Sequence, residues 1–204
     1  IPVPLMHRAL LLYAAGLALA TGTPAQAAKW KAKEQIKHYS ISGTTGRALY
    51  ASIGKNGPRL KGGRRTVAHT VWDLKWRRRY RKRGKACTIA SAKPFLTITY
   101  TLPKPAAKLR GPVAREWKVF ADGIAAHEKV HGRFARDTVN DIIRATVGLR
   151  IENDPNCRKI RARILEIVAE AYDGYRAASR TFDRTELSPG GNVQGLVRRL
   201  VNGG

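Results

Sequence analysis

One apolar stripe constrains the fold of this chain more than any other feature of its sequence. From Pro112 to about Val147 the spacing of apolar side chains is helical, and proline suits the first turn of a helix. The pattern predicts a long helix that buries one face, and it places two histidines on the buried side. The residues of this face are Val113, Trp117, Phe120, Ile124, His127, His131, Ala135, Thr138 and Ile142.

The two histidines and the residue after the first form the sequence H-E-x-x-H. Positions i and i+4 share a helix face, so His127 and His131 can bind one ion, and imidazole nitrogens suit zinc. Glu128 lies about 100° further round the helix, where it can act as a general base without being a ligand. Because burying two imidazoles without partners costs a few kcal/mol, we favour zinc over a structural histidine pair.

A third zinc ligand is expected from a second helix, predicted from about residue 155 to residue 179. The short connection predicts antiparallel packing of the two helices. Reflection of the chain about residue 151 places residue 171 opposite His131 and brings Glu170 to the edge of the buried face. Glu170 is therefore the expected third ligand, which would complete a His₂Glu set.

Other carboxylates remain candidates for the third position. Asp137 lies six residues after His131, the spacing of another class of zinc site. That class needs a chain turn, usually at a glycine three residues after the second histidine, and Phe134 stands there. Asp183 and Glu186, near the C-terminus, also remain possible.

Strand patterns precede the long helix. Residues 66–76 alternate with period two, and further strands are expected at residues 39–42, 87–89 and 95–102. The expected fold class is α+β, a small antiparallel sheet followed by a helical hairpin that carries H-E-x-x-H, as in zincins. A single domain at residues 37–187 and a loop with a basic tail at residues 188–204 are predicted. One face of the strand at residues 66–76 would consist of Ala68, Thr70, Trp72, Leu74 and Trp76.

The first residues resemble a secretory signal. A positive start at Met6 is followed by an apolar run at residues 9–20 and an A-x-A site at residues 25–27. Residues 1–27 are therefore expected to be removed as a signal peptide, with the residues before Met6 lying upstream of its start. A core helix is the alternative. Residues 28–36 are interpreted as a basic lead-in, and the mature protein as secreted or periplasmic without a transmembrane anchor.

The two cysteines are Cys87 and Cys157. In an oxidising compartment one disulfide is the simplest expectation, and a pair of free buried thiols is the alternative. The bond would close a loop of about 70 residues, which is worth on the order of 4 kcal/mol in the chain-entropy model.

Charge predicts an anionic partner. The chain has 39 basic and 14 acidic residues and a net charge of +25, which attracts polyanions. For a secreted protein an anionic envelope polymer is expected rather than nucleic acid. Residues 77–85 carry seven basic side chains in nine, either as a binding patch or as a solvated hairpin tip. The candidate contacts are Arg77, Arg78, Arg79 and Arg81.

A set of short motifs occurs in order along the chain: Tyr39, Ile41-Ser42-Gly43-Thr44, Gly57-Pro58, the alternating strand at 68–76, Cys87, Leu102-Pro103, Trp117, Phe120, the H-E-x-x-H sequence and Cys157. Together they resemble a bacterial family of predicted secreted zinc-dependent proteases, a domain of otherwise unknown function. The resemblance covers roughly residues 37–187 and implies zinc binding by His127 and His131, Glu128 as general base, and a disulfide between the cysteines. Relatives carry an aromatic–Asp pair followed by His-Gly. Here Phe182-Asp183 is followed by no histidine, and Glu186 is the possible substitute.

Two functions are therefore expected from the sequence. The first is a zinc metallopeptidase acting on a peptide or protein substrate, which an edge strand of the sheet at residues 66–102 could hold in extended form. The alternative is a non-enzymatic cell-envelope protein with a structural or degenerate metal site and a basic hairpin that binds a polyanion.

Overall fold

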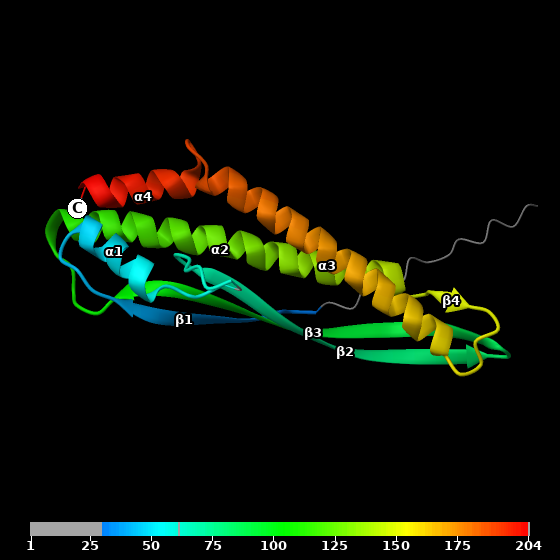
Figure 1. The fold of residues 1–204 in the computed structure, drawn as a ribbon. Helices are drawn as coiled ribbons and strands as arrows, with labels where there is room; N and C mark the ends of the chain where they lie inside the picture. The colour runs from blue at the N-terminus through cyan, green and yellow to red at the C-terminus, as the bar shows by residue number, and fades with distance from the viewer. Residues whose placement is uncertain (1–29, 61, 204) are drawn as a thin grey trace, which may run out of the picture.

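A computed structural model describes residues 30–60 and 62–203 of the chain. The predicted signal peptide at residues 1–27 lies outside this part. The α+β class is confirmed (Figure 1). The elements are β1 (Lys33–Ile41), α1 (Gly46–Asn56), β2 (His69–Arg83), β3 (Ala86–Pro105), α2 (Gly111–Thr146), β4 (Arg150–Ile151), α3 (Arg158–Leu187) and α4 (Asn192–Gly203).

The sheet has the strand order β1-β3-β2, with β4 paired to the first residues of β3. β2 and β3 form a long antiparallel hairpin, interrupted by a bulge between Arg79 and Tyr80. β1 runs parallel to β3, so the sheet is mixed where the sequence predicted antiparallel pairing. In Figure 1 the helices lie on one side of this sheet, and β2 is an edge strand.

The predicted alternation of β2 directs its apolar side chains toward the helices. Trp72, Leu74 and Trp76 pack against a buried cluster that joins β3 to α2. The ring centroid of Trp72 lies 4.7 Å from Tyr172 and 5.1 Å from Tyr175, both on α3. The period-two pattern was therefore correct, although β2 continues seven residues beyond Trp76, to Arg83.

The predicted long helix is present as α2, with Pro112 in its first turn. Its predicted face is buried from Phe120 to Ile142. Gly132, next to the second histidine, allows close approach to β3: a Cβ there would lie 2.1 Å from the hydroxyl oxygen of Tyr100. A larger residue would push α2 away from the sheet at this position.

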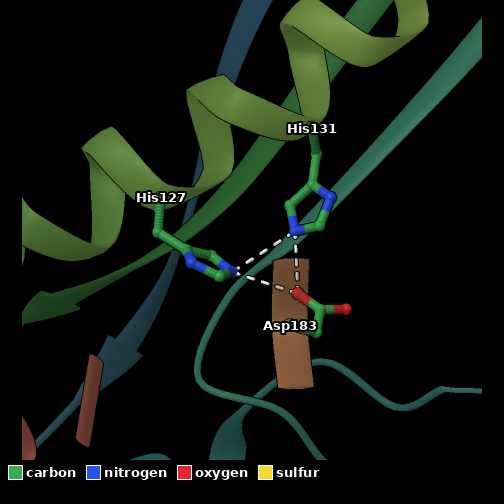
Figure 2. Close-up of side chains that lie close together, drawn as sticks. All are labelled: His127, His131 and Asp183. Atoms are coloured by element: carbon green, nitrogen blue, oxygen red, sulfur yellow. Dashed lines mark hydrogen bonds and ion pairs between the residues drawn. The ribbon is translucent and has the colours of Figure 1, made fainter. Parts of the chain in front are cut away.

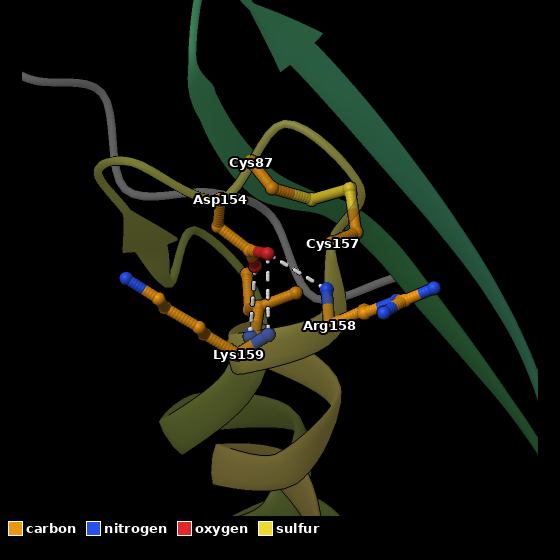
Figure 3. The surroundings of a disulfide bond; sticks show 6 residues. Cys87, Asp154, Cys157, Arg158 and Lys159 are labelled. Atoms are coloured by element: carbon orange, nitrogen blue, oxygen red, sulfur yellow. Dashed lines mark hydrogen bonds between the residues drawn. A yellow bond between two sulfur atoms is a disulfide. The ribbon is translucent and has the colours of Figure 1, made fainter.

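α3 begins at the disulfide-bonded end of the molecule. The predicted bond between Cys87 and Cys157 is present, and it ties the beginning of β3 to the beginning of α3 (Figure 3). The buried carboxylate of Asp154 accepts backbone hydrogen bonds from the first turn, at Arg158, Lys159 and Ile160. These contacts satisfy N–H groups that lack partners within the helix.

α3 does not pack beside α2 in the register that reflection about residue 151 predicted. His131 lies 15 residues before the end of α2 at Thr146, whereas Asp183 lies 25 residues after the beginning of α3 at Arg158. At 1.5 Å per residue, the ten-residue difference means that α3 begins about 15 Å beyond the end of α2. α3 then crosses α2 obliquely (Figure 1) and continues to Leu187, eight residues past its predicted end.

Both ends of the described chain are more ordered than expected. The predicted lead-in at residues 28–36 overlaps β1, whose Glu34 forms an ion pair with Arg136 of α2. The predicted loop and tail at residues 188–204 contain α4, which buries Val193 and Leu200 against α1 and α2. Among the described residues, no helix is both long and apolar enough to cross a membrane.

Candidate metal centre

Two histidines of α2 and one aspartate of α3 bring three possible ligand atoms together. Both imidazoles are buried, with 9% of His127 and 8% of His131 exposed. Their Nε2 atoms lie 3.3 Å apart, and Oδ1 of Asp183 lies 3.3 Å from the first and 3.0 Å from the second. Figure 2 shows the three atoms converging on one point between the helices.

These distances fit a zinc ion. Tetrahedral coordination with bonds of about 2.0–2.1 Å places any two ligand atoms about 3.3–3.4 Å apart. The three measured separations are close to this edge length, so an ion would need little movement of the side chains. Two imidazoles and one carboxylate also match the three protein ligands of catalytic zinc sites.

The other ring nitrogens face groups that can orient the imidazoles. Nδ1 of His131 lies 3.3 Å from Ser179 Oγ. Nδ1 of His127 is buried without a hydrogen bond, and its nearest carboxylate oxygen is Oε2 of Glu186, 3.7 Å away. A metal on Nε2 requires the proton on Nδ1, where a carboxylate partner typically holds a ligand histidine. Glu186 thus lies on the outer side of His127, where it can orient the ring but does not join the three ligand atoms.

Phe182 forms one wall of the site. Its ring stacks on His127, with centroids 4.7 Å apart and an angle of 21° between the planes. It also meets His131 edge-on at 5.5 Å. The two residues of the aromatic–Asp pair noted in the sequence therefore contribute differently. Phe182 packs against the imidazoles, and Asp183 supplies the carboxylate.

The charges within the cluster stabilise one another. Burial would lower the pKa of His127, but the hydrogen bond to Asp183 and the charges of Glu128, Asp183 and Glu186 outweigh it, and the pKa is raised. Burial would raise the pKa of Asp183, but the hydrogen bonds and charges of both histidines hold it well below its usual range. Asp183 is therefore ionised at neutral pH, as a metal ligand must be.

Glu128 is held close to the three ligand atoms but apart from them. Its side chain is buried, with 6% of the residue exposed. The hydroxyl of Thr70, on β2, donates to Oε2 of Glu128 at 2.6 Å. This hydrogen bond fixes one carboxylate oxygen and leaves the other to accept a proton.

A cavity of about 710 Å³ opens over these groups. The segment of residues 66–70, which includes the first two residues of β2, forms one wall, and α3 forms the other. His127, Glu128, His131 and Asp183 all line it, so a ligand in the cavity would meet the three ligand atoms and Glu128.

The structure places the other predicted ligands elsewhere. The side chain of Glu170 is 70% exposed and faces Arg163, whereas Asp183, one of the alternatives left open by the sequence, lies beside both histidines. Asp137 is exposed on α2, away from the histidine face. Sequence reasoning did not identify Thr70, Ser179 or Phe182 as parts of the site; only the aromatic–Asp pair pointed toward one of them.

A second candidate surface lies on the side of the sheet without helices. Phe95 is 44% exposed, and its ring centroid lies 5.7 Å from Cζ of Arg77 and 5.6 Å from Nζ of Lys93. Arg79 and Arg81 extend this surface along β2. Arg78 does not belong to it, because its guanidinium lies over Trp76, 4.7 Å from the ring centroid, on the side that the helices cover.

The fold and the site together define an α+β domain in which a buried H-E-x-x-H helix and an aspartate of the following helix form a group able to hold a metal. The chain belongs to the family described as "Bacterial protein of unknown function (DUF922)", whose model matches residues 36–191. No curated protein and no solved structure shows significant similarity to this chain.

Proposed function

We propose that this protein is a secreted or periplasmic zinc-dependent peptidase. The observation that carries the proposal is the spacing of the three ligand atoms of His127, His131 and Asp183, close to the edges of a zinc tetrahedron. The presence of Glu128 in the next position of the helix adds a base beside them. The disulfide and the signal-like first residues support an oxidising compartment.

The chemistry divides among a few side chains. When bound, zinc would lower the pKa of a coordinated water toward about 7 and polarise the scissile carbonyl. Glu128 accepts a proton from the attacking water and returns it to the leaving amine, which its free oxygen and its hydrogen bond from Thr70 allow. Ser179 contacts Nδ1 of His131, and Glu186 lies near Nδ1 of His127, where each can orient one imidazole.

The sheet offers a place for the substrate backbone. β2 is an edge strand, and the residues leading into it line the cavity beside Glu128. An extended peptide can pair with such an edge through its main chain, which would hold a scissile bond beside the base.

Metal analysis and three single variants test the proposal. Purified protein should contain about one zinc per chain. Glu128→Gln should keep the zinc and lose cleavage of a peptide library, whereas Asp183→Ala should lose both. Glu170→Ala is the matched control, because Glu170 is a carboxylate on the same helix that faces solvent. Iron in place of zinc, no bound metal, or undiminished cleavage by Glu128→Gln would each overturn the proposal.

A second candidate function rests on the surface around Phe95. An exposed aromatic ring between Arg77 and Lys93 favours binding of an anionic envelope polymer, with or without catalysis. Reversing the charges of Arg77 and Arg79 should weaken binding to a sulfated polysaccharide at low salt. Reversing the exposed Arg47 and Lys55 of α1 changes the net charge equally and is the control. Equal losses of affinity in both double variants would show that net charge, and not this surface, determines the binding.

A further inference from the structure

The cavity over the metal centre has a strongly basic rim. On one side of the cavity, Arg64 lies in the loop that precedes β2. On the other side, Arg180 and Arg184 lie on α3. The two helix residues are one turn apart, and each directly follows a residue that faces the histidines, Ser179 or Asp183. The register that directs Asp183 to the metal centre therefore also places two guanidinium groups on the wall of the cleft.

These arginines are available to a ligand. Within residues 30–60 and 62–203, Arg64 and Arg180 form no ion pair, and Arg184 donates a hydrogen bond to Thr181 alone, at 3.2 Å. Other arginines of α3 differ: Arg163 and Arg176 are paired with carboxylates of their own helix.

The acidic groups that line the cavity are already engaged. Glu128 accepts a hydrogen bond from Thr70, and Asp183 contacts both histidines. The remaining lining is largely apolar or uncharged, and it includes Ile124 and Val193. Among the described residues, the three cations of the cleft therefore form no ion pair with either of its two carboxylates, and the surface between them is partly apolar.

We propose that this cleft selects substrates through acidic side chains, with Arg64, Arg180 and Arg184 as the selecting residues. The ligand class is an extended peptide with Asp or Glu near the bond to be cut. This inference rests on the proposed peptidase function, but the preference for acidic peptides is a property of binding and can be measured without cleavage.

The size of the effect follows from the exposure of the three side chains. An ion pair at an exposed site is worth about 0.2–1 kcal/mol, which corresponds to roughly a 1.5- to 5-fold change in affinity for each arginine. Three such contacts would together favour an acidic peptide over its neutral counterpart by roughly 3- to 100-fold at low salt, with about 10-fold near the middle of that range. The preference should shrink as salt rises, because these groups are open to solvent.

Binding to a non-cleaving variant tests the inference. The probes are two fluorescein-labelled peptides of equal length, one with Glu at alternate positions and the other with Gln at the same positions. Their binding to full-length Glu128→Gln protein is followed by fluorescence anisotropy. The Glu peptide should bind about 10-fold tighter, and adding Arg180→Glu and Arg184→Glu should remove that preference. Arg163→Glu combined with Arg176→Glu is the matched control, because it reverses two charges on α3 outside the cavity, and it should leave the preference intact.

The outcomes separate this inference from the proposed function. Equal binding of the two peptides, or a preference that survives the double reversal, would overturn the selection of acidic substrates. An equal loss in the control with Arg163→Glu and Arg176→Glu would do the same, because it would show an effect of overall charge. If the preference depends on the cleft arginines while wild-type protein cleaves neither peptide nor the library, the inference stands and the peptidase proposal falls.

Discussion

Replacement of Asp183 by alanine should remove most of the stabilisation of the protein by zinc. Zinc supplied at about 100 times its dissociation constant stabilises a folded site by about 2.7 kcal/mol. For a domain of this size each kcal/mol raises Tm by roughly 2–4 °C, so zinc should raise the wild-type Tm by about 5–10 °C. Asp183 supplies the carboxylate of the three-atom group, with contacts of 3.3 and 3.0 Å to the two imidazoles.

The expected result in the variant follows from the same relation. If loss of the ligand weakens binding at least about 100-fold, zinc at the same concentration stabilises by about 0.4 kcal/mol, or roughly 1–2 °C. The assay is thermal unfolding followed by circular dichroism, after removal of metal with a chelator and again after addition of zinc. The difference between the two curves is the measure, because Asp183 also contacts the histidines in the metal-free protein and its loss lowers Tm directly.

The control for this experiment is Glu170→Ala. Glu170 lies on the same helix, is largely exposed, and was the ligand expected from sequence. It should keep the full zinc-dependent rise in Tm. If Asp183→Ala keeps that rise, or if Glu170→Ala loses it, the assignment of the third ligand from the geometry is refuted.

Three further predictions concern the surroundings of the site. Thr70→Val removes the hydroxyl donor to Glu128 and should lower kcat about 10-fold or more while zinc content is unchanged, and an unaltered kcat would contradict the role of this bond. Gly132→Ala should cost about 1–3 kcal/mol through overlap with the hydroxyl of Tyr100, and thermal unfolding should show a smaller cost in a Tyr100→Phe background. An equal cost in both backgrounds would mean that the overlap lies elsewhere. The pKa of Asp154 is lowered, because backbone N–H groups outweigh its burial, so this carboxylate stabilises the fold above about pH 4 and the contribution is lost as pH falls. Asp154→Asn should therefore lower Tm at pH 7 and flatten the decline of Tm in acid, and an unchanged acid profile would exclude this contribution.

Features that depend on periodic burial could be predicted from the sequence. The apolar stripe of α2 and the alternation of β2 each repeat over several turns or residue pairs, so the buried side chains are recognisable without knowledge of their partners. For this reason His127 and His131 were correctly predicted to lie on the buried face of α2. The apolar pattern of the short helix α4 repeats fewer times, and its basic residues suggested an unstructured tail. Val193 and Leu200 are nevertheless seven residues apart, so they share one buried face.

Features that depend on the relative placement of two helices could not be predicted in the same way. The choice of Glu170 assumed that α3 begins level with the end of α2, as in a simple hairpin. The structure instead inserts β4 and the segment around Asp154 between the helices, which moves the beginning of α3 outward. A shift of this kind changes which residue of α3 reaches the histidines but leaves the apolar pattern of each helix unaltered.

The disulfide and the length of β3 together account for the register of α3. Cys87 and Cys157 fix the beginnings of β3 and α3 at one point, and Tyr100 of β3 contacts α2 at Gly132, next to the second histidine. The 13 residues from Cys87 to Tyr100 span about 43 Å as a strand at about 3.3 Å per residue. The 26 residues from Cys157 to Asp183 span about 39 Å as a helix at 1.5 Å per residue. A helix that starts at this disulfide therefore needs about twice as many residues as the strand beside it to reach the metal centre. The helix that the sequence predicted, ending at residue 179, stops one turn short of this point, and the extra turn supplies both Phe182 and the carboxylate of Asp183.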